Sequence, residues 1–129
     1  MAIKKPEKFS VHIEMDVNLT PQDIDDIMVT ALEGGINYWC RRAEVVGEML
    51  GSYASEQISR GGSLILHDAE SSDKWELTRE KFLKGVALFF KENSWLQVED
   101  YAFVDLGSMD ADCADCIIQY ALFGELVFG

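Results

Sequence analysis

Apolar and polar side chains alternate strictly near the start of the chain. Between residues 9 and 17 every second side chain is apolar and those between are polar: Phe9, Val11, Ile13, Met15 and Val17 against Ser10, His12, Glu14 and Asp16. A period of two residues is typical of a β-strand with one buried face. We therefore expect a strand over residues 9–17.

Three later segments have the period of an α-helix. The first follows Thr20-Pro21, an N-cap hydroxyl and a first-turn proline, and we expect Gly34-Gly35 to end it in the left-handed conformation. The second is predicted from Thr78 to Asn93 and the third from Asp110 to Gly124. Their predicted inward faces are, in order, Ile24, Ile27, Met28, Ala31 and Leu32; Phe82, Leu83, Val86, Ala87, Phe89 and Phe90; and Cys113, Cys116, Ile117, Tyr120 and Ala121.

Shorter apolar runs between the helices indicate further strands. We expect strands over residues 36–47, 63–67 and 74–77, a short helix over 54–60, a turn over 69–73, and a strand or loop over 94–109. This order predicts an α+β fold, a mostly antiparallel sheet with about three helices packed on one face. The length of 129 residues fits a single compact domain over residues 1–129, in which residues 1–7 form a mobile lead.

Composition narrows the class of partner. The net charge is −12, from 11 lysines and arginines and 23 acids, so we expect no direct binding to nucleic acid or to an anionic membrane. There is no apolar run long enough to span a bilayer, and no apolar segment follows the first lysines as in a signal peptide. We therefore expect a cytoplasmic protein with reduced cysteines.

Cys113 and Cys116 form the most specific chemical motif. A redox role is disfavoured because a redox cysteine reacts as a thiolate, and the negative charges of Asp110, Asp112 and Asp115 disfavour that form. A C-x-x-C pair can instead share a zinc ion, with Cys40 and His67 as the further ligands, or the cysteines can pack as small core residues, which we favour. His12 and His67 have no evident catalytic neighbour, so we expect no enzyme and no certain cofactor.

The distribution of charge is more informative than the cysteines. All lysines and arginines lie at or before Lys91, and the remainder of the chain is acidic. An array of acids can bind a basic protein groove that normally holds nucleic acid, although an acidic surface can also serve solubility alone. The candidate partner-binding acids are Glu99, Asp100, Asp105, Asp110, Asp112 and Asp115.

Three stretches carry a resemblance to a known family. Residues 116–129 (CIIQYALFGELVFG), 23–44 (DIDDIMVTALEGGINYWCRRAE) and 58–85 resemble small acidic proteins carried by phages, prophages and integrative elements of Gram-positive bacteria. The resemblance brings no catalytic motif. It implies a protein of the host bacterial cytosol that inhibits a defence complex, as anti-CRISPR proteins inhibit RNA-guided nucleases, with a type II CRISPR effector as partner. The alternatives are a zinc-dependent protein or enzyme built on Cys113 and Cys116, and a structural or regulatory protein of the mobile element.

Overall fold

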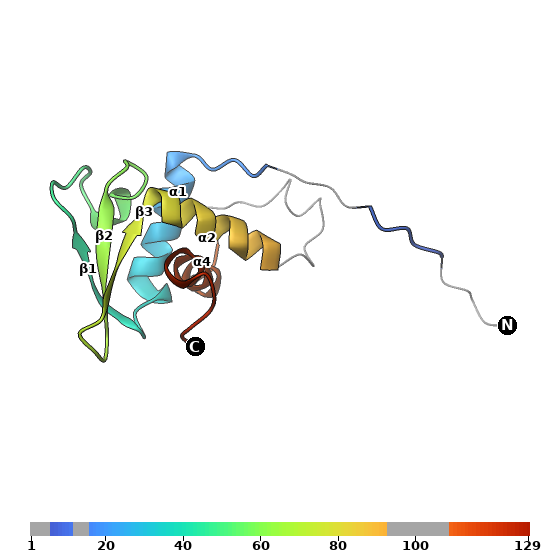
Figure 1. Cartoon of the computed structure of the whole chain (residues 1–129). Coiled ribbons are helices and arrows are strands. Elements are labelled where there is room, and N and C mark those ends of the chain that lie inside the picture. Colours follow the sequence, from blue (N-terminus) through green and yellow to red (C-terminus); the bar gives the residue numbers. More distant parts are fainter. Residues whose placement is uncertain (1–5, 12–15, 93–108) are drawn as a thin grey trace.

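The chain has an α+β fold, as the sequence predicts. The computed structural model describes residues 6–11, 16–92 and 109–129. These residues contain three α-helices, a three-stranded antiparallel sheet of order β1-β2-β3, and two short helical turns, η1 and η2. Figure 1 shows the sheet beside the group of helices. No helix in the described part of the chain is both long and apolar enough to cross a membrane.

Helix α1 (Pro21–Thr30) begins where the sequence predicts. The backbone N–H of Asp23 donates to Thr20 Oγ1 over 3.1 Å, and Asp23 Oδ2 accepts from the N–H of Thr20 over 2.8 Å. This reciprocal pair is a capping box, which satisfies two amides that a helix start would otherwise leave unpaired. The capping box fixes the residue at which the helix begins. In the helix that starts there, Ile24, Ile27 and Met28 are buried.

The end of this helix differs from the prediction. The chain continues through η1 (Ala31–Gly35), a π-helical turn in which the N–H of Ile36 donates to the carbonyl of Ala31 over 3.0 Å. Gly34 and Gly35 do not have positive φ, so the left-handed ending is wrong. Gly35 allows η1 to pack closely against the start of the last helix, because a Cβ there would lie 2.8 Å from the carbonyl oxygen of Ala111.

The sheet consists of β1 (Cys40–Val45), β2 (Ser63–Asp68) and β3 (Lys74–Thr78). Leu64 of β2 pairs with Val45 of β1 and Leu77 of β3, so these three side chains share one face of the sheet. That face contributes to the core, since Leu64 and Leu77 are completely buried. The short turn η2 (Ala54–Glu56) lies in the long connection between β1 and β2.

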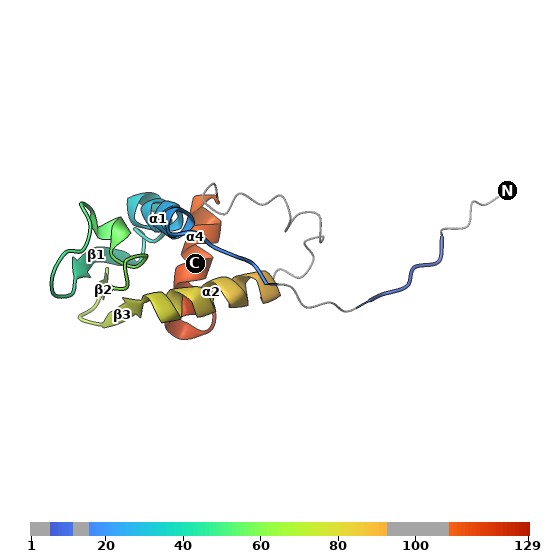
Figure 2. The same cartoon turned by 90° about the horizontal axis from the view of Figure 1, so that it is seen from above.

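Helices α2 (Arg79–Glu92) and α4 (Ala111–Phe123) cross each other closely (Figure 2). A Cβ on Gly85 of α2 would lie 2.5 Å from the carbonyl oxygen of Ile117 of α4. The predicted inward face of α2 is correct for its buried residues Phe82, Val86 and Phe89, but it is wrong for Leu83, which is 43% exposed, and for Ala87, which is also exposed. Gly124 ends α4 with φ of 72°, the left-handed conformation expected for a glycine after a helix.

The predicted strand over residues 9–17 is wrong for the part that the structure describes. Residues 9–11 and 16–17 are not in a strand, and Phe9 and Val11 are 82% and 81% exposed. Residues 12–15 and the segment 93–108, with its predicted strand or loop, lie outside the described residues. Alternation forms a strand only where a neighbouring strand completes the hydrogen bonds, and among the described residues β1 and β3 each pair with β2 and not with residues 9–11 or 16–17.

Candidate interaction surface

The predicted partner-binding acids have different surroundings. Asp110 and Asp112 are exposed at the start of α4. Asp110 is the N-cap, and the N–H of Cys113 donates to its Oδ1 over 2.8 Å, which lowers the pKa of the Asp110 carboxyl. Asp115 is only 9% exposed, so its predicted role as a surface acid is corrected. Glu99, Asp100 and Asp105 lie outside the described residues.

Asp115 belongs to a buried polar network that the sequence did not reveal. Its Oδ1 accepts from the indole N–H of Trp39 over 2.8 Å and from the side-chain amide of Gln119 over 2.9 Å, and its Oδ2 accepts from the hydroxyl of Tyr38 over 2.6 Å. Burial, and then the hydrogen bond to Asp115, raise the pKa of Tyr38 to about 12. These contacts explain the burial of a carboxylate, because each donor compensates for lost hydration.

Gln119 extends the network to the last residues of the chain. Its Oε1 accepts from the backbone N–H groups of Val127 and Phe128, each over 2.8 Å. The ring of Phe128 stacks on Trp39 with 4.9 Å between centroids and 3° between planes. Asp115 and Gln119, four residues apart on α4, therefore fix the C-terminal segment and the chain before β1. The signal available in the sequence was the i, i+4 spacing of Asp115 and Gln119, two polar residues that directly follow the buried residues Ala114 and Ile118.

The structure does not bring the predicted zinc ligands together. Within residues 6–11, 16–92 and 109–129, no three His, Cys, Asp or Glu side chains are close enough to hold a metal ion. Burial, and then the Asp110 carboxylate, raise the pKa of Cys113 to about 12, and burial also raises the pKa of Cys116 and of Cys40. Cys40 is buried in the core, and its Sγ donates to the carbonyl of Arg42 over 3.3 Å. Raised pKa values keep these thiols protonated at neutral pH when no metal is bound.

His67 has a charged environment that was not expected. Its Nε2 lies 2.9 Å from Glu44 Oε1 and 3.2 Å from Arg42 Nη2. The His67 hydrogen bond, followed by the charge of Arg42, lowers the pKa of Glu44. The three side chains lie on β1 and β2, where Arg42 is the register partner of His67. This arrangement covers one face of the sheet with polar contacts and places His67 away from the cysteines of α4.

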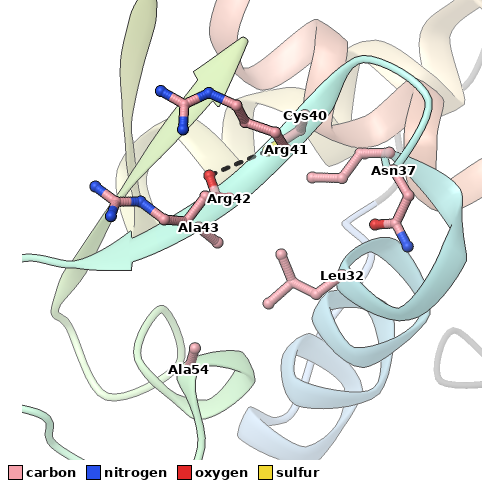
Figure 3. A pocket seen from close by; sticks show the side chains of 8 residues that line it. Leu32, Asn37, Cys40, Arg41, Arg42, Ala43 and Ala54 are labelled. Atoms are coloured by element: carbon pink, nitrogen blue, oxygen red, sulfur yellow. Dashed lines mark hydrogen bonds between the residues drawn. The ribbon is translucent and has the colours of Figure 1, made fainter. Parts of the chain in front are cut away.

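Two pockets in the described part of the chain are small. The first, of about 270 Å³, lies between η1, β1 and η2 and is lined by Leu32, Cys40, Arg41, Arg42 and Ala43 among others. Figure 3 shows Leu32 and Ala43 facing each other, whereas the guanidinium groups of Arg41 and Arg42 point away from Leu32. Its lining therefore combines apolar side chains such as Leu32 and Ala43 with polar groups, among them Asn37. The second, of about 240 Å³, lies beside Tyr38, Trp39 and the last two residues.

Two stretches of the chain that contain no basic residue meet in the fold. Residues 9–40 and 92–129 contain no lysine or arginine, and α1 with η1 comes from the first stretch and α4 from the second. The two meet where Gly35 packs against Ala111. We call five acids of these elements the acidic face: Asp23 and Asp26 of α1, Glu33 of η1, and Asp110 and Asp112 at the start of α4. The described basic residues lie elsewhere, in residues 6–11, β1, β3, α2 and the segment after η2.

Comparisons with known proteins do not assign the chain to a family. The chain matches no protein-family model, no curated protein and no solved structure. Its function is therefore argued from the arrangement of its own residues.

Proposed function

We propose that this protein is a binding module that inhibits a partner with a basic surface, and that the partner is a defence nuclease of the type II CRISPR class. The observation that carries the proposal is the acidic face, in which two stretches without lysine or arginine, far apart in the sequence, meet in space. Potentials of opposite sign attract two proteins and orient them before contact.

The partner surface in this proposal is a groove that normally binds nucleic acid. A duplex carries one negative charge per roughly 1.7 Å of its axis, so a protein that competes for the same groove needs several fixed acids. Helix α1 supplies Asp23 and Asp26, η1 supplies Glu33, and α4 supplies Asp110 and Asp112. Asp23 and Asp110 are held by capping hydrogen bonds, which fix the carboxylates at the helix starts. This supports a mobile-element inhibitor that acts by binding and not by catalysis.

The experiment combines a pull-down with a DNA-cleavage assay against several purified type II effectors at rising salt. The test variant combines Glu33→Gln with Asp112→Asn and removes two charges from the acidic face. The matched control combines Glu76→Gln with Glu80→Gln and removes two exposed charges from β3 and α2. We expect the first variant to bind about tenfold more weakly at low salt, and we expect the difference to shrink as salt screens the charges. Absence of inhibition with every effector would refute the nuclease as partner.

A further inference from the structure

The connection between β1 and η2 exposes several large apolar side chains. Within residues 46–53, Val46 is 39% exposed, Met49 48%, Leu50 43% and Tyr53 71%. Isolated exposed apolar residues are ordinary, but a contiguous group marks an interaction surface. Tyrosine and methionine are enriched at such surfaces. We call residues 46–53 the clamped loop, for the contacts described next.

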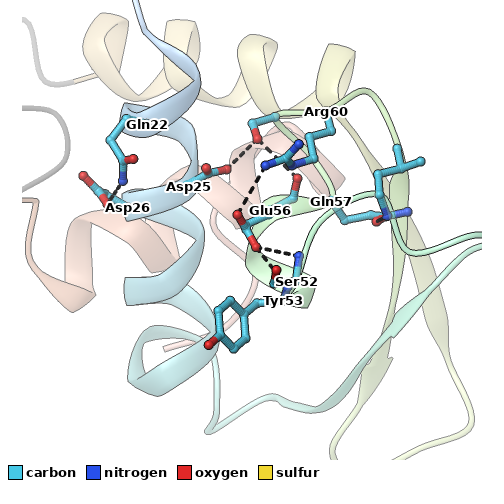
Figure 4. Close-up of polar contacts among 10 residues, drawn as sticks. Gln22, Asp25, Asp26, Ser52, Tyr53, Glu56, Gln57 and Arg60 are labelled. Carbon is cyan, nitrogen blue, oxygen red and sulfur yellow. Dashed lines mark hydrogen bonds and ion pairs between the residues drawn. The ribbon is translucent and has the colours of Figure 1, made fainter.

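Two side chains that follow the loop hold its backbone (Figure 4). Glu56 Oε1 accepts from the N–H groups of Ser52 and Tyr53 over 2.8 and 3.0 Å. Gln57 Oε1 accepts from the N–H of Leu50 over 3.0 Å, and its Nε2 donates to the carbonyl of Glu48 over 3.1 Å. Gln57 is 1% exposed, so these hydrogen bonds are shielded from water. The backbone is fixed while the apolar side chains face solvent.

Glycines make room for both clamping side chains. A Cβ on Gly62 would collide with the side chain of Gln57, and one on Gly51 would lie 2.7 Å from Cβ of Glu56. Gly47 has φ of 69°, a conformation that side chains with a Cβ rarely adopt. An ordered loop loses little conformational entropy when it binds, so its exposed apolar groups add more to affinity than those of a flexible loop.

The turn η2, which follows the loop, adjoins α1. Asp25 Oδ1 accepts from the hydroxyl of Ser59 over 2.5 Å, which joins α1 to the segment that follows η2. Figure 4 shows Asp25 on the side of α1 that faces Glu56, whereas Asp26 lies on the other side of the helix, where it accepts from the side-chain amide of Gln22. Glu48 is an exposed acid within the loop itself, and Glu56 carries an ion pair with Arg60 at 3.5 Å. The acids near the apolar group, Asp25, Glu48 and Glu56, outnumber Arg60, which is paired with Glu56, and we call them its acidic border.

We propose that the clamped loop is the apolar anchor of the partner contact and that it enters an apolar pocket bordered by lysine and arginine on the partner protein. This inference rests on the proposed function and specifies the partner surface. Charge complementarity carries it, because the acidic border requires a basic one. The same charge opposes the alternative occupant, a second copy of this chain with its own −12 charge.

The first test does not need the natural partner. A short synthetic peptide with a leucine and phenylalanine centre and lysines on both sides is titrated into isotope-labelled protein, and backbone amide shifts are recorded. We expect saturable shifts in residues 46–53 and α1. A peptide with serines in the centre and one with glutamates at both ends should produce none there. Shifts confined to other elements, equal shifts with all peptides, or no saturable shifts would overturn the proposal, as would concentration-dependent self-association through the loop.

The second test uses any effector that binds in the assay above. Met49→Ser with Leu50→Ser should weaken binding at least tenfold, mainly through faster dissociation, with the same salt dependence as the parent chain. Leu83→Ser is the matched control, since Leu83 and Leu50 are both 43% exposed. If the acidic-face variant weakens binding and the loop variant does not, the anchor is refuted and the proposed function stands. If no effector binds, the peptide titration alone decides the anchor.

Discussion

Replacing Gly85 with alanine tests the crossing of α2 and α4. In a solvated helix this substitution stabilises by about 1 kcal/mol, because glycine is the poorer helix former. Here the added Cβ would lie 2.5 Å from the carbonyl oxygen of Ile117 and 2.8 Å from the Cβ and backbone N of Ala121. Two of these three atoms belong to the backbone, which cannot rotate away as a flexible side chain can.

The expected cost follows from how far the helices must separate. Ordinary contact begins near 3.4 Å, so relief requires a movement of roughly 1 Å, and a gap of that size forfeits a quarter to a half of the contact energy. Overpacking of a well-packed core typically costs about 1–3 kcal/mol, which outweighs the gain in propensity. We expect a net loss of about 2 kcal/mol and a melting temperature lower by on the order of 10 °C.

Urea unfolding followed by tryptophan fluorescence measures this loss, and Gly34→Ala is the control. Gly34 lies in η1 without positive φ, and a Cβ added to it would meet nothing within 4 Å, so its replacement should be neutral or slightly stabilising. A Gly85→Ala protein as stable as the parent chain would show that α2 and α4 do not approach this closely.

Three further predictions concern polar groups and thiols. Asp115→Ala should destabilise by about 3 kcal/mol in urea unfolding, because it leaves the buried indole N–H of Trp39 unpaired and removes the shortest hydrogen bond that the Gln119 amide donates, whereas Asp115→Asn should cost less. Cys113, with its pKa of about 12, should react with iodoacetamide at pH 8 far more slowly than a free cysteine, as mass spectrometry would show, and a chelator should leave the melting temperature unchanged. Asp110→Ala should cost about 1 kcal/mol at neutral pH. Because the folded-state pKa of Asp110 is lowered, its stabilisation is present above the unfolded value of about 3.9 and is lost as pH falls through the folded pKa, so parent and variant unfolding curves should converge in acid.

The elements that the sequence predicted correctly are those specified by adjacent residues. Thr20, Pro21 and Asp23 specify the start of α1 within one turn of chain, and Gly124 specifies the end of α4. Strands β2 and β3 follow from short apolar runs separated by a polar turn. In each case the hydrogen-bond donors and acceptors that decide the conformation belong to residues only a few positions apart, so local pattern is sufficient.

The inward face of α4 was predicted less well, for a physical reason. The predicted stripe contained Cys113, Cys116 and Tyr120, which are only partly buried, and it omitted Ala114 and Ile118, which are fully buried. Helix α4 contacts α2 as well as α1, η1 and β3. A helix with neighbours on several sides is apolar over much of its circumference, so the period of its apolar residues does not select one face.

The acids of the last segment show why charge along a sequence is a poor map of charge on a surface. Asp110, Asp112 and Asp115 lie within six positions, yet the first two are exposed and the third is buried. The hydroxyl and indole that hold Asp115 belong to residues separated from it by 77 and 76 positions. Conversely, η1, which carries Glu33, lies against the start of α4, which carries Asp110 and Asp112, because Gly35 lets η1 approach Ala111. The surface that we propose binds a basic partner is therefore assembled by packing, and a substitution at Gly35 that separates η1 from α4 should weaken that binding without changing any charge.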